Sequence, residues 1–272
     1  MRFGGCAVSL TIVSIYPIIL SVINDIIPKD GGSMIIDVSE HNGHIDWAKA
    51  KPHIDGAIIR IGYGQNSTSQ DDKRAEENIM GCIENGIPYG LYLYSYADIP
   101  AKVRGEIAHM QRWVDNTQRW ADKTHPQLGV WYDLEESSCR AMFPYCITIF
   151  NSVYGNAGGI YMSASDAKVY LKTGRKWIAS WGKNDGYVPA AQYKPNADIW
   201  QYTSKARIPG INGYVDANLD QRLFKSNAGQ LKTVDDMVDA VVAGKFGNGE
   251  DRKNRLYTYI QQKVNQRLKG GK

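Results

Sequence analysis

Two acidic side chains at the end of a predicted buried strand are the strongest chemical signal in this chain. The apolar run that ends at Leu134 contains Asp133 and is followed by Glu135, so the two acids are spaced i, i+2. Side chains in a strand alternate between faces, which places both carboxylates on one face with Cα atoms roughly 6–7 Å apart. Glycoside hydrolysis is the commonest chemistry that needs such a pair. The spacing therefore points to a glycosidase site.

Two further acids are predicted at the same place. Asp37 ends the first apolar strand pattern, and Asp216 lies in the last one. If the strands close into a barrel, the first and last become neighbours, and catalytic residues of such barrels come from the carboxyl ends of several strands. Asp198 begins its strand at the opposite end, so we exclude it. A structural alternative is that these Asp residues only cap turns or helices.

Four carboxylates in one small site cannot all ionise freely. Repulsion and partial burial raise the pKa of at least one of them, and that group becomes a proton donor near neutral pH. We expect Glu135, with its longer reach, to be the general acid. Asp133 is expected to stay ionised and to stabilise positive charge near the anomeric carbon. Asp37 and Asp216 would position the substrate and tune the other two acids.

From Met34 onward, short apolar runs alternate with amphipathic segments. The predicted strands are Met34–Val38, Ala57–Ile61, Tyr89–Tyr94, Leu128–Leu134, Gly159–Tyr161, Lys176–Ala179, Asp198–Tyr202 and Gly213–Leu219. The predicted helices are Asp71–Asn85, Ala101–Trp120, Met142–Tyr154 and one that is capped by Ser163 or Ser165. After Lys176 the connections are too short for full helices.

This alternation predicts an α/β fold, an irregular (β/α) barrel of eight strands with reduced helices, over residues 34–224. An open doubly wound sheet is the alternative, although the chain has no Gly-rich phosphate loop to support it.

Aromatic residues with a polar group dominate over Phe, with 17 Tyr and 7 Trp against 5 Phe. Such rings can stack on sugars while bonding their hydroxyl groups, although barrel rims show the same bias. The candidate substrate-binding residues at or just past strand ends are Tyr63, Tyr94, Tyr161 and Trp181.

The histidines and cysteines do not form a metal-binding pattern. His41 and His44 are read as surface residues, and Cys6, Cys82, Cys139 and Cys146 show no paired C-x-x-C spacing. We therefore predict no metal and no cofactor. A disulfide between Cys139 and Cys146 stays open.

Residues 1–33 form a leader of uncertain status. An uncharged run follows Arg2 and reaches the lower limit of about 18 apolar residues for spanning a bilayer. It reads as a signal anchor, as a secretory signal with no evident cleavage site, or as an over-long start before Met34. The last option is slightly favoured.

The end of the chain carries all the excess positive charge. The formal net charge is +4, and from Leu231 onward there are nine basic and five acidic residues. Residues 225–230 read as a linker, and residues 231–270 as short helices with a small core. The charge suggests an anionic partner surface, or simply a solvated helical face.

The segment from Met34 to Phe224 resembles a known family, the glycoside hydrolase family 25 muramidases found among phage endolysins and bacterial autolysins. The matching motifs occur in order from Met34 to Phe224: Ile36-Asp37-Val38-Ser39, Asn42-Gly43, Ile45-Asp46-Trp47, Ala57-Ile58-Ile59-Arg60-Ile61-Gly62, Trp131-Tyr132-Asp133-Leu134-Glu135, Ile160-Tyr161, Trp177-Ile178-Ala179, Trp200-Gln201-Tyr202-Thr203 and Val215-Asp216.

The resemblance implies an irregular eight-stranded barrel that cuts the β-1,4 bond between N-acetylmuramic acid and N-acetylglucosamine with retention. It implies that Asp37, Asp133, Glu135 and Asp216 are the active-site acids. The i, i+2 spacing favours assistance by the substrate's N-acetyl group over a carboxylate nucleophile. The expected partner is bacterial peptidoglycan and not nucleic acid, and a membrane is involved only if residues 1–33 are an anchor. We expect a monomer that acts at the cell wall, outside the cell or after release from the cytoplasm during lysis.

The segment Val234–Leu268 resembles the short cell-wall-binding repeats of certain phage lysozymes, carried by the stretch Val241–Leu256. That resemblance implies a three-helix module with Asn248, Gly249 and Arg252 near the ligand. Three other readings of the chain stay open: a chitinase-like glycosidase, a non-catalytic peptidoglycan-binding protein, and a membrane-anchored interaction protein.

Overall fold

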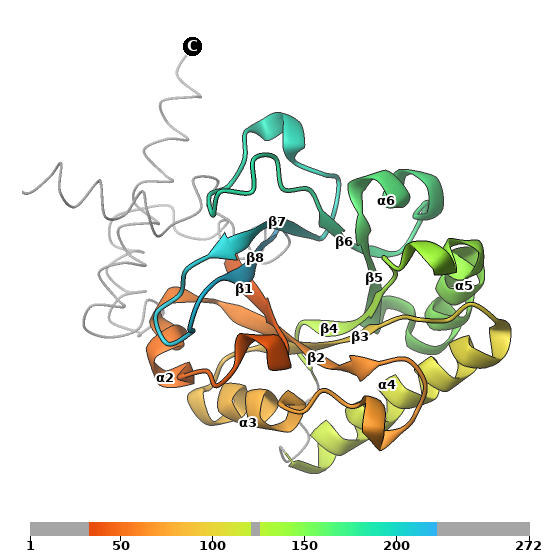
Figure 1. The fold of residues 1–272 in the computed structure, drawn as a ribbon, viewed down its shortest axis with the longest axis horizontal. Coiled ribbons are helices and arrows are strands. Elements are labelled where there is room, and N and C mark those ends of the chain that lie inside the picture. The colour runs from red at the N-terminus through yellow and green to blue at the C-terminus, as the bar shows by residue number, and fades with distance from the viewer. Residues whose placement is uncertain (1–32, 121–125, 222–272) are drawn as a thin grey trace, which may run out of the picture.

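The computed structural model describes residues 33–120 and 126–221, which form a closed barrel of eight strands (Figure 1). Each strand is hydrogen-bonded to the next one along the chain, and the last pairs with the first. The strands are β1 Ser33–Val38, β2 Gly56–Tyr63, β3 Tyr89–Tyr94, β4 Gly129–Asp133, β5 Gly158–Ser163, β6 Arg175–Ala179, β7 Ile199–Ala206 and β8 Val215–Asp220. The predicted eight-stranded barrel is confirmed.

The direction of the last strand was not predicted. Strands β1 to β7 run parallel, whereas β8 is antiparallel to both β7 and β1. The start of β8 therefore lies at the end of the barrel where the other strands finish, which we call the mouth. In this register Asp216 lies directly opposite Asp37.

The opposite half of the barrel interior is an apolar plug, which we call the floor. Its buried side chains form one cluster of Ile35, Ile58, Leu128, Trp131, Tyr161, Trp177 and Ile199. The rings of Trp131 and Tyr161 both meet the ring of Trp177 edge to face, at 5.8 and 4.6 Å between centroids. Aromatic contacts of this geometry add to the apolar burial, so the barrel is a packed core and not a pore.

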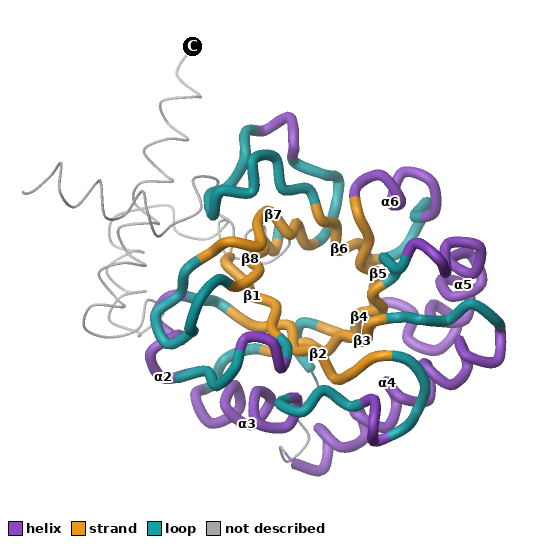
Figure 2. Tube along the Cα trace, viewed as in Figure 1, coloured by secondary structure: helices purple, strands orange, loops and turns teal. Residues whose placement is uncertain are grey.

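Helices pack on the outside of the first six strands, and loops replace them beside β7 and β8 (Figures 1 and 2). The helices are α2 Trp47–Ala50, α3 Ala75–Asn85, α4 Pro100–Trp120, α5 Phe143–Tyr154 and α6 Ala164–Tyr170. Of the two predicted caps of α6, Ser163 is the one used, because its side chain accepts a hydrogen bond from Asp166 N–H. After β6 the structure describes only the short 3-10 turn Ala191–Tyr193 before β7, as the prediction of reduced helices requires.

Helix α3 begins at Ala75 and not at Asp71, because two acids before it are engaged in tertiary contacts. Asp71 accepts hydrogen bonds from both guanidinium nitrogens of Arg112 and from His109 of α4. Asp72 accepts hydrogen bonds from Arg60 Nε of β2 and from Glu40 N–H. These contacts fix both residues outside the helix.

The open question of a disulfide is answered by the structure. Cys139 and Cys146 are buried as free thiols, as is Cys82. Burial raises the pKa of the Cys146 thiol to about 12. Cys6, the leader 1–33 apart from its last residue, and the linker and repeat 225–270 lie outside the described residues.

Within the described ranges, no helix has the length and apolar character needed to cross a membrane, and no three His, Cys, Asp or Glu side chains are grouped as metal ligands.

Candidate active site

The four predicted acids meet at the mouth of the barrel. Asp37 and Asp133 are inward-facing and buried, at 7% and 5% exposure. Asp216 is half-buried, and Glu135 is exposed. Glu135 lies two residues beyond the last paired residue of β4, but Leu134 N–H still bonds to Tyr161 O of β5 at 3.0 Å. The strand alternation therefore continues, and Asp133 and Glu135 share a face as predicted.

Asp37 and Asp216 form a pair that amide side chains hold. Asp37 Oδ2 accepts hydrogen bonds from Asn218 Nδ2 at 2.8 Å and from Gln201 Nε2 at 3.1 Å. The same Gln201 nitrogen donates to Asp216 Oδ2 at 3.3 Å. Burial raises the pKa of Asp37 to about 6, against the effect of these hydrogen bonds. Burial and then the charge of Asp37 raise the pKa of Asp216 to about 8.

Asp133 is more deeply buried than the sequence suggested. Burial raises its pKa well above the ordinary value, the charge of Glu135 adds to this, and the charge of Arg60 opposes it. Its Oδ1 atom is buried with no hydrogen-bond partner among the described residues. In the free protein these surroundings favour a protonated Asp133, which differs from the expectation that it stays ionised.

Glu135 lies where a proton donor would meet an incoming substrate. Loss of hydration raises the pKa of its carboxyl, the charge of Asp37 adds to this, and the nearby Tyr161 hydroxyl opposes it. A carboxyl with a raised pKa in an accessible position has the properties of a general acid.

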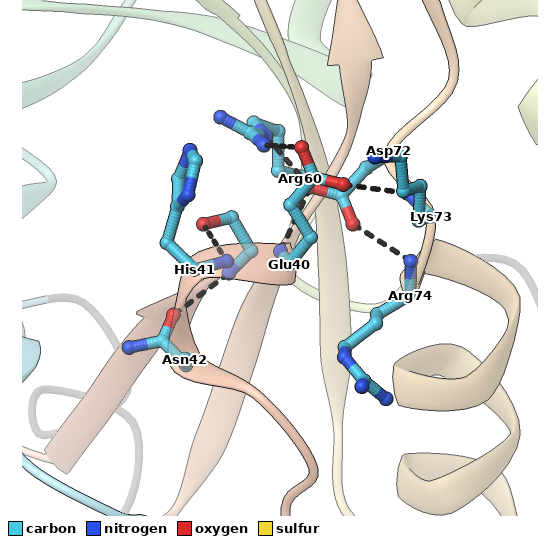
Figure 3. Close-up of polar contacts among 8 residues, drawn as sticks. Glu40, His41, Asn42, Arg60, Asp72, Lys73 and Arg74 are labelled. Carbon is cyan, nitrogen blue, oxygen red and sulfur yellow. Dashed lines mark hydrogen bonds and ion pairs between the residues drawn. The ribbon is translucent and has the colours of Figure 1, made fainter. Parts of the chain in front are cut away.

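Arg60 is a functional candidate that the sequence analysis missed. It projects from β2, and its charge acts on Asp133 and on Tyr92. Figure 3 shows how it is held: Nε donates to Asp72 Oδ2 at 2.7 Å, and Nη2 donates to Glu40 Oε1 at 3.2 Å. The Arg60 side chain is 13% exposed, so this fork fixes a positive charge beside a group of acids.

Three of the four predicted aromatic residues line the acids. Tyr161 OH donates to Gln201 Oε1 at 2.9 Å, and Trp181 Nε1 donates to the same oxygen at 3.0 Å. Burial raises the pKa of Tyr94, and the charges of Glu135 and then Asp133 add to this, which places its hydroxyl near them.

The fourth aromatic residue, Tyr63, lies farther out. Its ring meets that of Tyr96 edge to face at 6.0 Å, and Tyr96 in turn contacts Tyr94 at 4.9 Å. Tyr96 is 47% exposed and was not predicted.

The end of β3 that carries these rings is anchored from behind by Glu106 of α4. This fully buried carboxylate accepts hydrogen bonds from Tyr96 N–H at 2.8 Å, from Ser95 Oγ at 2.7 Å and from Tyr132 OH. Three donors compensate the carboxylate for its lost hydration. Because Tyr132 precedes Asp133, the same group ties the aromatic rim to the acid-bearing strand.

The missed residues share one signal. Arg60, Gln201 and Asn218 each lie two residues from a floor residue or an active-site acid on the same strand, and so they face inward. A polar residue on the inward face near a strand end could have been selected by that rule.

Comparison with known proteins agrees with this geometry. Residues 36–211 match the model of glycosyl hydrolases family 25, and residues 235–268 match the CW_7 repeat. Lysozyme M1 from Streptomyces globisporus is 24% identical over 212 residues, which are 70% of this chain and 69% of that protein.

Solved structures with the same fold include the catalytic domain of endolysin ply40 from bacteriophage P40 of Listeria monocytogenes. Its TM-score is 0.62 at 22% identity, covering 72% of this chain and 96% of that one. The modular autolysin LytC from Streptococcus pneumoniae, in complex with a synthetic peptidoglycan ligand, has a TM-score of 0.53 at 25% identity, covering 71% of this chain and 47% of that one. Since the family match spans more than half of the sequence, the chain belongs to glycosyl hydrolases family 25 and is a glycoside hydrolase.

Proposed function

We propose that this enzyme is a lysozyme that hydrolyses the β-1,4 bond between N-acetylmuramic acid and N-acetylglucosamine in bacterial peptidoglycan, with retention. The observation that carries the proposal is the convergence of Asp37, Asp133, Glu135 and Asp216 at one end of the barrel, where the charges of the other three each raise the pKa of Asp133. The names of the relatives, two lytic enzymes of cell walls and a lysozyme, support the same substrate.

In the proposed mechanism, Glu135 gives its proton to the leaving glycosidic oxygen. The N-acetyl oxygen of the substrate attacks the anomeric carbon from the opposite side, and an oxazolinium ion forms as the bond to the leaving sugar breaks. Glu135, now ionised, then takes a proton from the water that opens the ring and returns the amide. One group acts as acid and then as base, which yields retention.

Asp133 stabilises the intermediate in this scheme. Its carboxyl is protonated most readily when the site is empty, because burial penalises the charge. A positive charge forming on the substrate beside it favours the ionised form, so the stabilisation develops during the reaction and is small in the free enzyme. The charge of Arg60 also favours the ionised form.

The rim aromatics Tyr94, Tyr161 and Trp181, with Tyr63 farther out, are proposed to contact the sugar rings. Trp181 is 38% exposed at the mouth, which leaves part of its ring free to stack.

We further propose that residues 34–224 form the catalytic barrel and that residues 231–270, beyond the linker 225–230, bind the wall. Asn248, Gly249 and Arg252 are the proposed ligand contacts. A single repeat binds weakly, since avidity normally comes from several copies. Replacement of Arg252 by Ala in the full chain should reduce sedimentation with purified walls while leaving hydrolysis of soluble fragments unchanged.

The test of the activity is hydrolysis of purified peptidoglycan by the full chain. After borohydride reduction of the products, muramitol at the new ends identifies the bond, and ¹H NMR of early products should show the β-anomer. N-acetylglucosaminitol at those ends, or turnover of chitin oligomers without release from peptidoglycan, would refute the assigned bond. Wall binding without any release of reducing ends would make the protein a non-catalytic binder.

The N-acetyl step has its own test. A soluble substrate whose muramic acid carries a free amine cannot form the oxazolinium ion, so we expect no turnover above background. Turnover at the rate of the acetylated substrate would instead require a carboxylate nucleophile.

A further inference from the structure

Gln201 of β7 uses all four hydrogen-bonding positions of its side chain at the mouth. Its oxygen accepts from Tyr161 OH and Trp181 Nε1, at 2.9 and 3.0 Å. Its nitrogen donates to Asp37 Oδ2 and Asp216 Oδ2, at 3.1 and 3.3 Å. The residue is 2% exposed, so little of the side chain is left to water.

The orientation of this amide is forced by its neighbours. An indole N–H can only donate, so the group that meets Trp181 must be the amide oxygen. The two N–H bonds of Gln201 are then directed at the two carboxyl groups. The same argument fixes Asn218, because Trp177 Nε1 donates to its Oδ1 atom at 2.6 Å, and its nitrogen therefore donates to Asp37.

The two amides treat the two acids unequally. Asp37 Oδ2 accepts from both of them, whereas Asp216 accepts only the longer bond from Gln201 among the described side chains. Hydrogen bonds donated to a carboxyl favour its ionised form, and an oxygen that already accepts two N–H groups is a poor place for a proton. Adjacent carboxyl groups that cannot both ionise hold one proton between them, and that proton belongs on the partner that accepts fewer hydrogen bonds from the protein.

We propose that Gln201 is a positioning residue that, together with Asn218, places the single proton of the Asp37/Asp216 pair on Asp216 and leaves Asp37 ionised at neutral pH. The role of this pair in the reaction rests on the proposed function, but the location of the proton is a property of the free protein. The pKa values of about 6 for Asp37 and about 8 for Asp216 have the order that this arrangement requires.

The consequence for the reaction passes through Glu135. A negative Asp37 raises the pKa of Glu135 and so keeps the general acid protonated. The other groups that face the pair are Asp133 of β4, Tyr92 of β3, Tyr161 of β5 and Arg60 of β2. The charges of Asp37 and Asp216 raise the pKa values of Asp133, Tyr92 and Tyr161, and the charge of Arg60 lowers those of Asp133 and Tyr92. Loss of the Gln201 donor raises the pKa of Asp37, so a smaller fraction of Asp37 is ionised near pH 6–7. Because less negative charge then faces Glu135, the pKa of Glu135 falls.

The direct test is a ¹³C NMR titration of aspartate carboxyl carbons in the full chain. Asp37→Asn and Asp216→Asn assign the two signals. In the wild type, the lower step of the coupled titration should be reported chiefly by Asp37 and the upper step by Asp216. In Gln201→Met, which keeps the size but removes the amide, the two steps should approach each other by about one pH unit. A wild-type titration in which Asp216 ionises first would overturn the proposal.

Two further variants keep the test independent of folding effects. Trp181→Phe keeps an aromatic ring at an exposed position and removes the indole N–H donor. The amide oxygen then accepts from Tyr161 alone, and the two titration steps should shift in the same direction by less. Gln111→Met is the matched control, because Gln111 also donates an amide N–H to an aspartate, Asp115, but on the outer face of α4. It should leave both titration steps in place.

Hydrolysis supplies the second readout. The alkaline limb of the pH profile of kcat/KM should move to lower pH in Gln201→Met, with a loss of about tenfold at pH 7 for one pKa unit. An unmoved limb in a folded variant would contradict the positioning role. If instead the wild-type chain releases no reducing ends from peptidoglycan while the titration order holds, the proposed function fails and the proton assignment stands.

Discussion

The floor and the mouth of the barrel are built by the same strands. On each of these strands, the floor residue and the mouth residue are two positions apart. Ile35 precedes Asp37 on β1, Trp131 precedes Asp133 on β4, and Ile199 precedes Gln201 on β7. These three floor residues are 0% exposed, whereas the next inward position on each strand carries a carboxyl or an amide. The comparison shows that a rigid apolar layer directly supports the reacting groups, so stability and catalysis can be separated by mutation within one strand.

The largest effect is expected from the acids of the mouth. Asp133→Asn and Glu135→Gln should each lower kcat/KM on peptidoglycan by about 10²–10⁴-fold, because each removes a proton donor or a charge that acts in the transition state. The matched control is Glu136→Gln, a half-buried neighbour that caps the 3-10 turn Ser137–Met142. It should keep near wild-type activity. Wild-type rates for both site variants would remove the basis of the assignment.

The floor should respond in the opposite way. Ile58→Ala deletes three carbons from a fully buried position, and such a change costs about 2–5 kcal/mol of unfolding free energy. Activity per folded molecule should stay within a few-fold of wild type, because Ile58, although paired with Asp37 in the register of β1 and β2, offers no polar group to the reaction. Urea denaturation and active-site-normalised rates measure the two quantities. A loss of activity as large as that of Glu135→Gln would contradict the separation of the two layers.

The mouth should also make the protein less stable as the pH rises. Asp216 has a folded pKa of about 8, far above the ordinary value of 3.8, so the folded protein holds a proton that the unfolded chain has lost between about pH 4 and 8. The contribution is therefore greatest at low pH and disappears as the pH rises through this window. Asp216→Asn should flatten the dependence and be more stable than wild type by over about 1 kcal/mol at pH 8.

Thermal melts from pH 4 to 8 test this expectation, with the helix residue Asp115→Asn as the control. Two results would count against a protonated Asp216: a wild-type melting temperature that rises steadily with pH, or an Asp216→Asn variant whose melting temperature depends on pH as strongly as that of the wild type.

The smallest effect is expected from the cation of the mouth. Arg60→Lys keeps the charge, but a single ammonium cannot span Asp72 and Glu40 as the guanidinium fork does. We expect a loss of about 1 kcal/mol in stability and a several-fold loss in kcat/KM. Arg140→Lys removes a similar fork onto Asp166 outside the mouth and should leave kcat/KM unchanged. Equal effects of the two variants on kcat/KM would show that Arg60 has only a structural role.

Much of the barrel could be predicted because its strands are buried on both faces and read as short apolar runs. Strand β3 was placed at its observed bounds, and the acids of β1 and β4 were found because two-residue alternation needs no tertiary knowledge. The reversal of β8 could not be predicted, since an alternating pattern reads the same in both directions. Nor could the late start of α3, which depends on the contact of Asp71 with Arg112, more than forty residues apart.

The partners within the site were the hardest to predict. Gln201 and Asn218 are single polar residues inside apolar runs. Two-residue alternation can place them on the inward face, but it does not show which groups they contact. Their role depends on Trp177 of β6 and on Trp181 in the loop after β6, whose N–H groups donate to them. Hydrogen-bond orientation of this kind exists only after the barrel has closed.

The antiparallel closure also has a topological consequence. Because β8 returns toward the floor, Asp220 ends beside Ser33, and these two residues pair across the seam between β8 and β1. Neighbouring ends at the side away from the acids are the geometry in which circular permutation is tolerated. A short peptide linker that joins Asp220 to Ser33 should leave all eight strands intact. New chain termini can then be introduced within residues 183–195, between β6 and β7, without cutting a strand.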